Sequence, residues 1–338
     1  TATVAPAGGA VPERGERRGS RFLRCRNTLL IATIGILSPF INAPAAEAAC
    51  SNVGRLVFSW DPIRVPTPSN LCRFVKDNAA AIRLGKAWFW DMQAGRDGVT
   101  ACASCHFHAG SDNRVKNQIS PHGNAIPPSK RGFEIARPNG TVTPRRFPFH
   151  KLEDPENRRS GVISDSNDVM SSQGVHRTQF LDIVPGQAAE SVRVVPDPVF
   201  NVGGVNVRQV EPRQTMNVIN AVFNIEQFWD GRGKFYFNGV NPFGLLDPDA
   251  RILEKQGTAL GASVTKVKVE IDTASLASQA VGPALSAVEM SAAGRSFPKI
   301  GKKLLTLVPL GKQVVHPRDS VLGPLSRDTG ALTVRGLS

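Results

Sequence analysis

The pentapeptide Cys102-Ala-Ser-Cys105-His106 constrains this chain more than any other part of its sequence. Its spacing places two thiols one helical turn apart with an imidazole directly after them, so a short helix would present all three groups together. Two thiols at this spacing can form thioethers with both vinyl groups on one edge of a porphyrin, and the imidazole can then ligate the iron. Cys-x-x-Cys-His is therefore typical of covalent attachment of c-type haem.

A redox disulfide and a structural zinc site are the two alternative functions of this motif, and each accounts for fewer of its residues than haem attachment does. A redox disulfide needs only the two cysteines and gives His106 no role. A structural zinc site usually needs a second ligand pair, and the chain has no other Cys-x-x-Cys and no His-x3-His. We therefore expect one haem c in this chain, held by Cys102 and Cys105, with His106 as the iron ligand.

The first 48 residues have the three regions of a secretory signal. A basic stretch runs from Arg14 to Arg26, an apolar run follows over 27–41, and small residues lead to Ala48. The apolar run contains Pro39 and is shorter than the ~20 residues that a membrane-spanning helix needs. We expect residues 1–48 to be the signal and upstream residues, with no stable membrane span and a mature protein that is periplasmic or secreted.

The remaining cysteines suggest a disulfide. Cys25 would leave with the signal, and an oxidising compartment would allow Cys50 and Cys72 to pair. Spacing alone does not fix the geometry that a disulfide needs, so two free thiols stay open as the alternative.

Composition limits the class of protein. The hydrophobic content of 41% is enough for a globular core, and 31 Gly with 25 Pro indicate long loops. The net charge is +13, but no run of Lys and Arg alternates with aromatic residues, so we expect no nucleic-acid partner. The diffuse charge would attract an acidic partner or simply be a solvated surface.

Periodicity predicts an amphipathic helix over 69–90, helical segments over 215–224 and 284–306, and a short strand over 266–271. Residues 109–206 lack strong periodicity and predict an inserted loop region. Together these patterns predict a mainly α fold: a cytochrome c-like domain with long irregular loop insertions and little strand.

Four segments, in one order, resemble the bacterial di-haem cytochrome c peroxidase / MauG family. They are Leu84 to His106, Glu211 to Ala221, Phe228-Trp-Asp-Gly-Arg232, and Gln279 to Met290, with its Gln-x-x-Gly-Pro and Glu-Met. The resemblance implies an N-terminal (peroxidatic) haem domain over 49–325, with insertions near 109–206 and 233–270. It also implies that 326–338 begin a connection to a second haem domain that this sequence lacks.

The resemblance also implies roles for single residues. His106 is the proximal ligand, Trp229 lies between two haems as an electron stepping stone, and Gln279 and Glu289 face the distal pocket. Glu289 would take a proton from peroxide and return it to the leaving oxygen. The implied activity is reduction of hydrogen peroxide to water with electrons from a small redox protein, and the resemblance also admits a homodimer.

Departures from the family pattern leave alternatives open. The family's distal His falls on Asn206 by one count and on His122 by another. Our hypothesis is a five-coordinate haem open to peroxide or dioxygen, which resembles the MauG and rubber-oxygenase branches. A separate expectation is that Phe243, in Asn241-Pro-Phe-Gly244, caps this pocket with an apolar side chain. Gln214 replaces an Asn that helps bind calcium, which weakens the expectation of a calcium site.

The single Cys-x-x-Cys-His is the largest departure, because the family has two haems. Two alternatives to a peroxidase therefore stand beside it. One is a truncated or degenerate single-haem protein that transfers electrons or only binds haem. The other is a member of the branch that attacks an organic substrate with dioxygen.

Overall fold

The computed structural model describes residues 64–107, 112–121, 132–257, 260–328 and 335–338. Every described residue belongs to one compact unit. The predicted signal, Cys50 and His122 lie outside the described residues. Cys72 is disulfide-bonded, and its pairing with Cys50 stays a prediction.

The expectation of a mainly α chain with little strand is wrong. Helices of all kinds take up 21% of the described residues and strands 16%. The α-helices are α1 (Asn78–Trp90), α2 (Ala103–His106), α3 (Ser275–Ala280) and α4 (Phe297–Leu304). Short 3₁₀ helices are η2 (Leu71–Arg73), η3 (Met92–Ala94), η5 (Pro144–Arg146), η6 (Ala221–Phe223), η7 (Gly244–Leu246), η8 (Pro283–Leu285) and η9 (Gly323–Leu325).

Local chemistry explains why the expected helices are shorter. The carboxylate of Asp77 accepts a hydrogen bond of 2.9 Å from the Ala80 N–H, so α1 begins at residue 78 rather than at 69. Over 215–224 only η6 forms, after Asn220 adopts a left-handed φ of 58°. Over 284–306 the chain is extended at Ser296, and α4 begins after it with Pro298 in its first turn.

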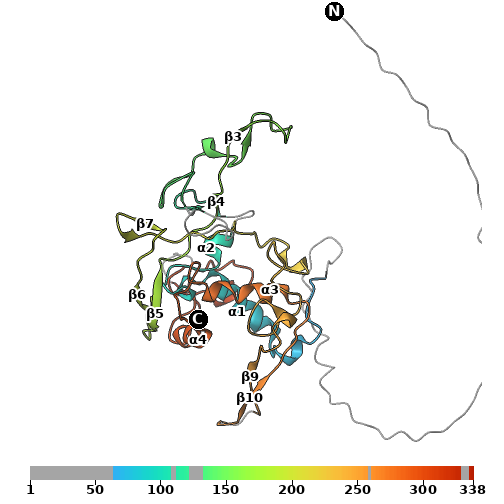
Figure 1. Cartoon of the computed structure of the whole chain (residues 1–338). Helices are drawn as coiled ribbons and strands as arrows, with labels where there is room; N and C mark the ends of the chain where they lie inside the picture. The colour runs from blue at the N-terminus through green and yellow to red at the C-terminus, as the bar shows by residue number, and fades with distance from the viewer. Residues whose placement is uncertain (1–63, 108–111, 122–131, 258–259, 329–334) are drawn as a thin grey trace, which may run out of the picture. The chain divides into compact units, whose positions relative to one another are not determined.

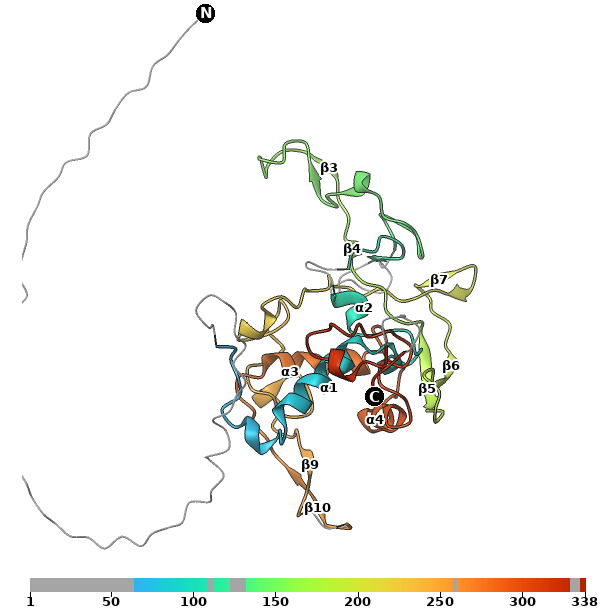
Figure 2. The ribbon, with the colours of Figure 1, turned by 180° about the vertical axis from the view of Figure 1, so that it is seen from behind.

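The region 109–206 was expected to be irregular, but its described part contains antiparallel pairs. These pairs are β1 (Ile119–Ser120) with β4 (Val169–Met170), β2 (Lys151–Leu152) with β3 (Val162–Ser164), β5 (Thr178–Asp182) with β6 (Ser191–Val194), and β7 (Asn201–Val202) with β8 (Val205–Asn206). The strand expected over 266–271 lies earlier in the chain: β10 is Val264–Val267 and pairs with β9 (Ile252–Lys255), and only residues 266 and 267 are shared with the expectation. The β2–β3 and β9–β10 pairs extend away from the helices (Figures 1 and 2).

A small apolar core joins α1 to the C-terminal segment. It contains Ala87, Leu310, Val315, Leu322 and Leu337. The buried carboxylate of Asp91, just after α1, accepts a 2.8 Å hydrogen bond from the Leu310 N–H, which fixes the two segments together. None of the helices in the described part of the chain is long and apolar enough to span a bilayer.

A buried ionic cluster joins α4 to the turn that precedes the pentapeptide. The side chains of Glu190, Arg295 and Lys303 are all 0% exposed. The Lys303 ammonium lies 2.6 Å from Glu190 Oε1 and donates a 2.9 Å hydrogen bond to the carbonyl of Gly95. Arg295 also pairs with Glu190 and donates a 2.8 Å hydrogen bond to the carbonyl of Ala94.

We predict that Lys303→Met destabilises the fold by about 3–5 kcal/mol, because it breaks a buried charge cluster by removing one partner. The matched control is Lys302→Met on the same helix, where the side chain is exposed and the change should stay within about 0.5 kcal/mol. Urea unfolding measures both. Equal unfolding midpoints for the two variants would contradict the prediction.

Candidate functional site

The pentapeptide forms the short helix α2 with Cys102 as its N-cap. The turn before it is fixed by Asp97, whose carboxylate accepts hydrogen bonds of 3.0 Å from the Val99 N–H and 2.9 Å from the Thr100 hydroxyl. The His106 N–H donates to the Cys102 carbonyl at 3.2 Å. This closed turn presents two half-buried free thiols and the imidazole from one short element.

His106 is held in one tautomer. Its Nδ1 lies 2.7 Å from the Met216 carbonyl oxygen, which can only accept, so Nδ1 carries the hydrogen. Burial lowers the pKa of His106, which favours the neutral ring at neutral pH. The Nε2 lone pair is then available for iron, the arrangement usual for ligating histidines.

The two thiols have different neighbours. Cys102 Sγ lies 3.9 Å from the Met290 sulfur, whereas Cys105 Sγ lies 3.7 Å from an Arg114 nitrogen. Burial raises the pKa of Cys102 to about 11 and also raises that of Cys105. Low-pKa thiols are typical of redox disulfide motifs, so these protonated thiols do not favour that use.

The described residues hold no group of three or more His, Cys, Asp or Glu arranged to bind a metal ion.

A cavity of about 440 Å³ lies along the segment that holds His106 in place. Its lining residues are Gln214, Thr215, Met216, Asn217, Ile219, Ala221 and Asn224. Met216 therefore belongs both to this cavity and to the histidine contact. The Gln279 amide donates a 2.6 Å hydrogen bond to the Met216 sulfur, so Gln279 is brought against the same segment.

Residues 172–175 hydrogen-bond to the two segments that carry Glu211 and Glu289, and so hold these two segments near each other. The Glu211 N–H donates to the Ser172 carbonyl at 3.1 Å, and the Val175 N–H donates to the Val288 carbonyl at 2.8 Å. Burial, together with the neighbouring Glu289, raises the pKa of Glu211 to about 8. Burial also raises the pKa of Glu289. The pair therefore keeps a proton near neutral pH, which suits general acid–base chemistry.

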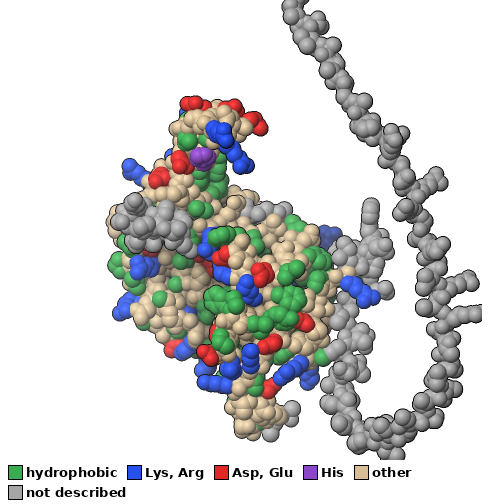
Figure 3. All heavy atoms as spheres, turned by 45° about the vertical axis from the view of Figure 1, so that its right-hand side comes forward, with side chains coloured by type: hydrophobic (Ala, Val, Ile, Leu, Met, Phe, Trp, Pro, Cys, Tyr) green, Lys and Arg blue, Asp and Glu red, His purple; other side chains and the backbone are tan. Residues whose placement is uncertain are grey.

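Two predicted residues lie apart from this group. The Trp229 side chain is 79% exposed, and its ring stacks under the Arg213 guanidinium at 5.3 Å rather than lying inside the described fold. Phe243 is also exposed and does not line the cavity. Figure 3 shows apolar side chains grouped on one face, beside basic ones.

The residues present fit a c-type haem. One helical turn presents two free thiols, the imidazole is in the tautomer that iron needs, and the cavity lies along the segment that orients it. Sequence reasoning missed Met216, Glu211 and Arg114 as parts of this site. Met216 and Glu211 lie inside a family-like segment, so their positions carried a signal. The position of Arg114 carried no such signal, because Arg114 lies outside the four segments that resemble the family.

Gly174→Ala should destabilise the site by about 1–3 kcal/mol. A Cβ at residue 174 would lie 1.9 Å from the Val288 carbonyl oxygen and 2.7 Å from Glu289 Cα, so the backbone at Val288 and Glu289 would have to move. The matched control is Gly301→Ala in α4, where a Cβ meets nothing within 4 Å and a gain of roughly 0.4–1 kcal/mol is expected. Denaturant unfolding measures the free energy of unfolding of both variants. A Gly174→Ala chain as stable as the unaltered chain would contradict this close packing.

Glu211→Gln should change how stability depends on pH. The pKa of Glu211 is raised in the folded chain, from 4.5 to about 8. Its contribution to stability is complete below the unfolded pKa and is lost as the pH rises through the folded one. The variant should match the unaltered chain at about pH 4 and be the more stable at about pH 9. The measurement is the urea midpoint across this range, with the exposed Glu226→Gln as control. Parallel curves for the unaltered chain and Glu211→Gln would contradict the raised pKa.

Comparison with known proteins supports the family resemblance over part of the chain. No curated protein and no solved structure matches it. A family model does match: residues 187–307, about a third of the chain, match the di-haem cytochrome c peroxidase family. This range contains Glu211, Met216, Gln279 and Glu289, whereas the pentapeptide precedes it. The predicted resemblance to the di-haem cytochrome c peroxidase family is thus confirmed for residues 187–307.

Proposed function

We propose that this protein is a c-type haem oxidoreductase of the di-haem peroxidase type, exported to the periplasm or secreted. It would reduce hydrogen peroxide to water with electrons from a small redox protein. One observation carries the proposal: the 2.7 Å contact between His106 Nδ1 and the Met216 carbonyl. This contact joins the pentapeptide to the stretch that matches the peroxidase family.

The haem would be held by chain groups that lie together. Cys102 and Cys105 would form the two thioethers, and His106 would supply the nitrogen ligand through Nε2. When bound, haem supplies a redox-active iron that accepts electrons and binds peroxide. The Met216 carbonyl keeps the imidazole oriented, because it accepts the hydrogen of Nδ1.

The chain's own contribution to the reaction is proton handling. The Glu289 carboxylate would take the proton from one peroxide oxygen and deliver it to the other, which would leave as the first water. Over the whole turnover, hydrogen peroxide would take up two electrons from the redox protein and two protons from solvent, so that its second oxygen also leaves as water. Glu211 lies beside it, and the pair retains a proton near neutral pH. The Gln279 amide, which donates to the Met216 sulfur, would orient the peroxide by hydrogen bonding.

A single-haem electron-transfer protein is the second candidate. The exposed Trp229 favours it, because a surface aromatic side chain can contact a redox partner directly. Such a protein would hold haem and exchange electrons without turning over peroxide. The dioxygen-using branch would instead consume oxygen with an organic substrate.

The first test of the proposal is covalent haem. Protein exported through its native route should carry haem that survives denaturation, seen by intact mass and by the pyridine haemochrome spectrum. A Cys102→Ala/Cys105→Ala double variant should carry none. Absence of covalent haem from the unaltered chain would sink the proposal.

Peroxide reduction separates the two candidates. Glu289→Gln should lower the rate by about 10²–10⁴-fold, because the acid–base group is lost, without changing haem content. The exposed Glu226→Gln is the matched control and should keep the full rate. A haem-loaded chain with no peroxide turnover would favour the electron-transfer protein.

A further inference from the structure

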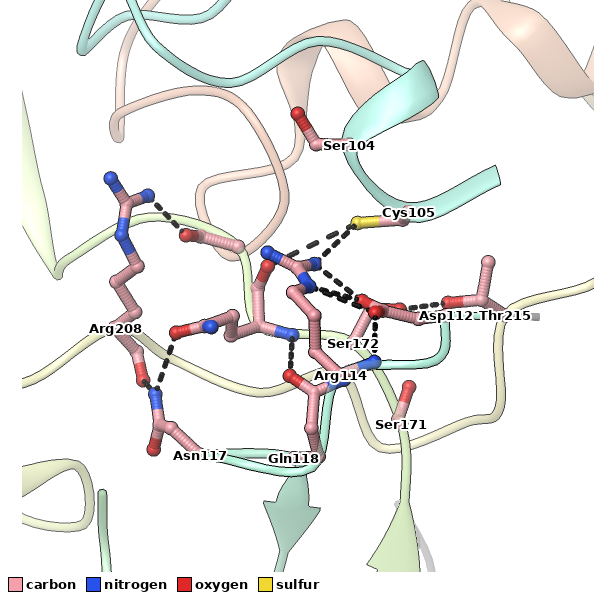
Figure 4. Close-up of polar contacts among 12 residues, drawn as sticks. Ser104, Cys105, Asp112, Arg114, Asn117, Gln118, Ser171, Ser172, Arg208 and Thr215 are labelled. Atoms are coloured by element: carbon pink, nitrogen blue, oxygen red, sulfur yellow. Dashed lines mark hydrogen bonds and ion pairs between the residues drawn. The ribbon is translucent and has the colours of Figure 1, made fainter. Parts of the chain in front are cut away.

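A polar network surrounds the second cysteine of the motif (Figure 4). The Arg114 guanidinium lies 3.7 Å from Cys105 Sγ, and its Nε donates to both carboxylate oxygens of Asp112 at 2.8 and 2.9 Å. Ser172 hydrogen-bonds the same carboxylate, and its hydroxyl lies 2.6 Å from that of Thr215. The network joins α2 to three other segments of the chain.

Asp112 is the anchor of this network. Its side chain is only 5% exposed, whereas that of Arg114 is 37% exposed. Burial opposes ionisation of Asp112, but the hydrogen bonds from Arg114 hold its pKa below the ordinary value. The carboxylate therefore stays charged and fixes the planar guanidinium through a fork of parallel hydrogen bonds. A guanidinium fixed in this way presents its outer nitrogen to Cys105 in one direction.

Among the described residues, Cys102 has no polar neighbour comparable to Arg114. Its Sγ meets the Met290 sulfur at 3.9 Å, a soft contact that many orientations of a flexible methionine can satisfy. Cys105 instead meets both the Arg114 nitrogen and, at 3.9 Å, the Gln173 carbonyl. The two thiols of the motif thus differ in how firmly the fold directs them.

We propose that Arg114 and Asp112 position Cys105 for attachment of haem, an inference that rests on the proposed haem binding. In that step the Cys105 sulfur adds to the inner carbon of a vinyl group, and the thiol hydrogen ends on the outer carbon. One S–C bond and one C–H bond form while the S–H bond and the vinyl π-bond break. No electron is gained or lost, so a fixed sulfur direction is the chain's contribution.

The test counts the thiols that stay free after haem attachment. Haem-loaded protein is denatured, alkylated with iodoacetamide and mapped by peptide mass. In the unaltered chain neither cysteine should be alkylated. In Arg114→Met we expect Cys105 to be alkylated in most chains while Cys102 stays linked to haem. Arg193→Met, an exposed arginine on β6, is the matched control and should behave like the unaltered chain.

A second variant separates positioning from folding. Asp112→Asn keeps the guanidinium but loosens it, so it should also leave Cys105 free, to a smaller extent than Arg114→Met. Complete attachment of Cys105 to haem in both variants would overturn the positioning role of Arg114 and Asp112 while leaving the haem assignment intact. Absence of covalent haem from the unaltered chain would overturn the haem assignment and, with it, the positioning role of Arg114 and Asp112.

Discussion

The hydrogen bond from His106 to the Met216 carbonyl is the contact on which the rest of the site depends. The two residues are 110 positions apart, and neither segment has regular structure of its own beyond α2. A carbonyl that accepts from Nδ1 fixes the tautomer and the ring direction together. The same residue contacts Gln279 through its sulfur and lines the cavity. Met216 therefore connects the Cys-x-x-Cys-His motif, the cavity and the Gln279 amide.

A fold with so little helix needs other ways to hold these segments in register. The ionic cluster of Glu190, Arg295 and Lys303 does this behind the pentapeptide, where water is excluded and each charge must be paired. At the site itself, Gly174 holds the segments together, since only a residue without a side chain lets its backbone approach Val288 and Glu289 this closely. Buried pairing and close backbone approach replace the extensive helix packing that the sequence suggested.

The site combines groups of opposite chemical character. The thiols and the imidazole are neutral because burial disfavours their charged forms, while Asp112 beside them stays ionised because Arg114 binds it. Glu211 and Glu289 retain a proton because two carboxylates near each other in a partly buried position cannot both ionise cheaply. In the proposed function, the groups for haem attachment and those for proton handling would thus be separated by their environment rather than by distance along the chain.

The sequence by itself determined the groups with strict local spacing. Cys102, Cys105 and His106 act through one helical turn, and the family-like segments containing Gln279 and Glu289 were recognisable without a structure. Tertiary structure decided what spacing cannot express. Helix lengths were wrong because caps, prolines and a left-handed Asn220 ended them locally. Trp229 lies exposed, and Arg114 reaches Cys105 only because hydrogen bonds with Asp112, Ser172 and Thr215 join segments that are distant in sequence.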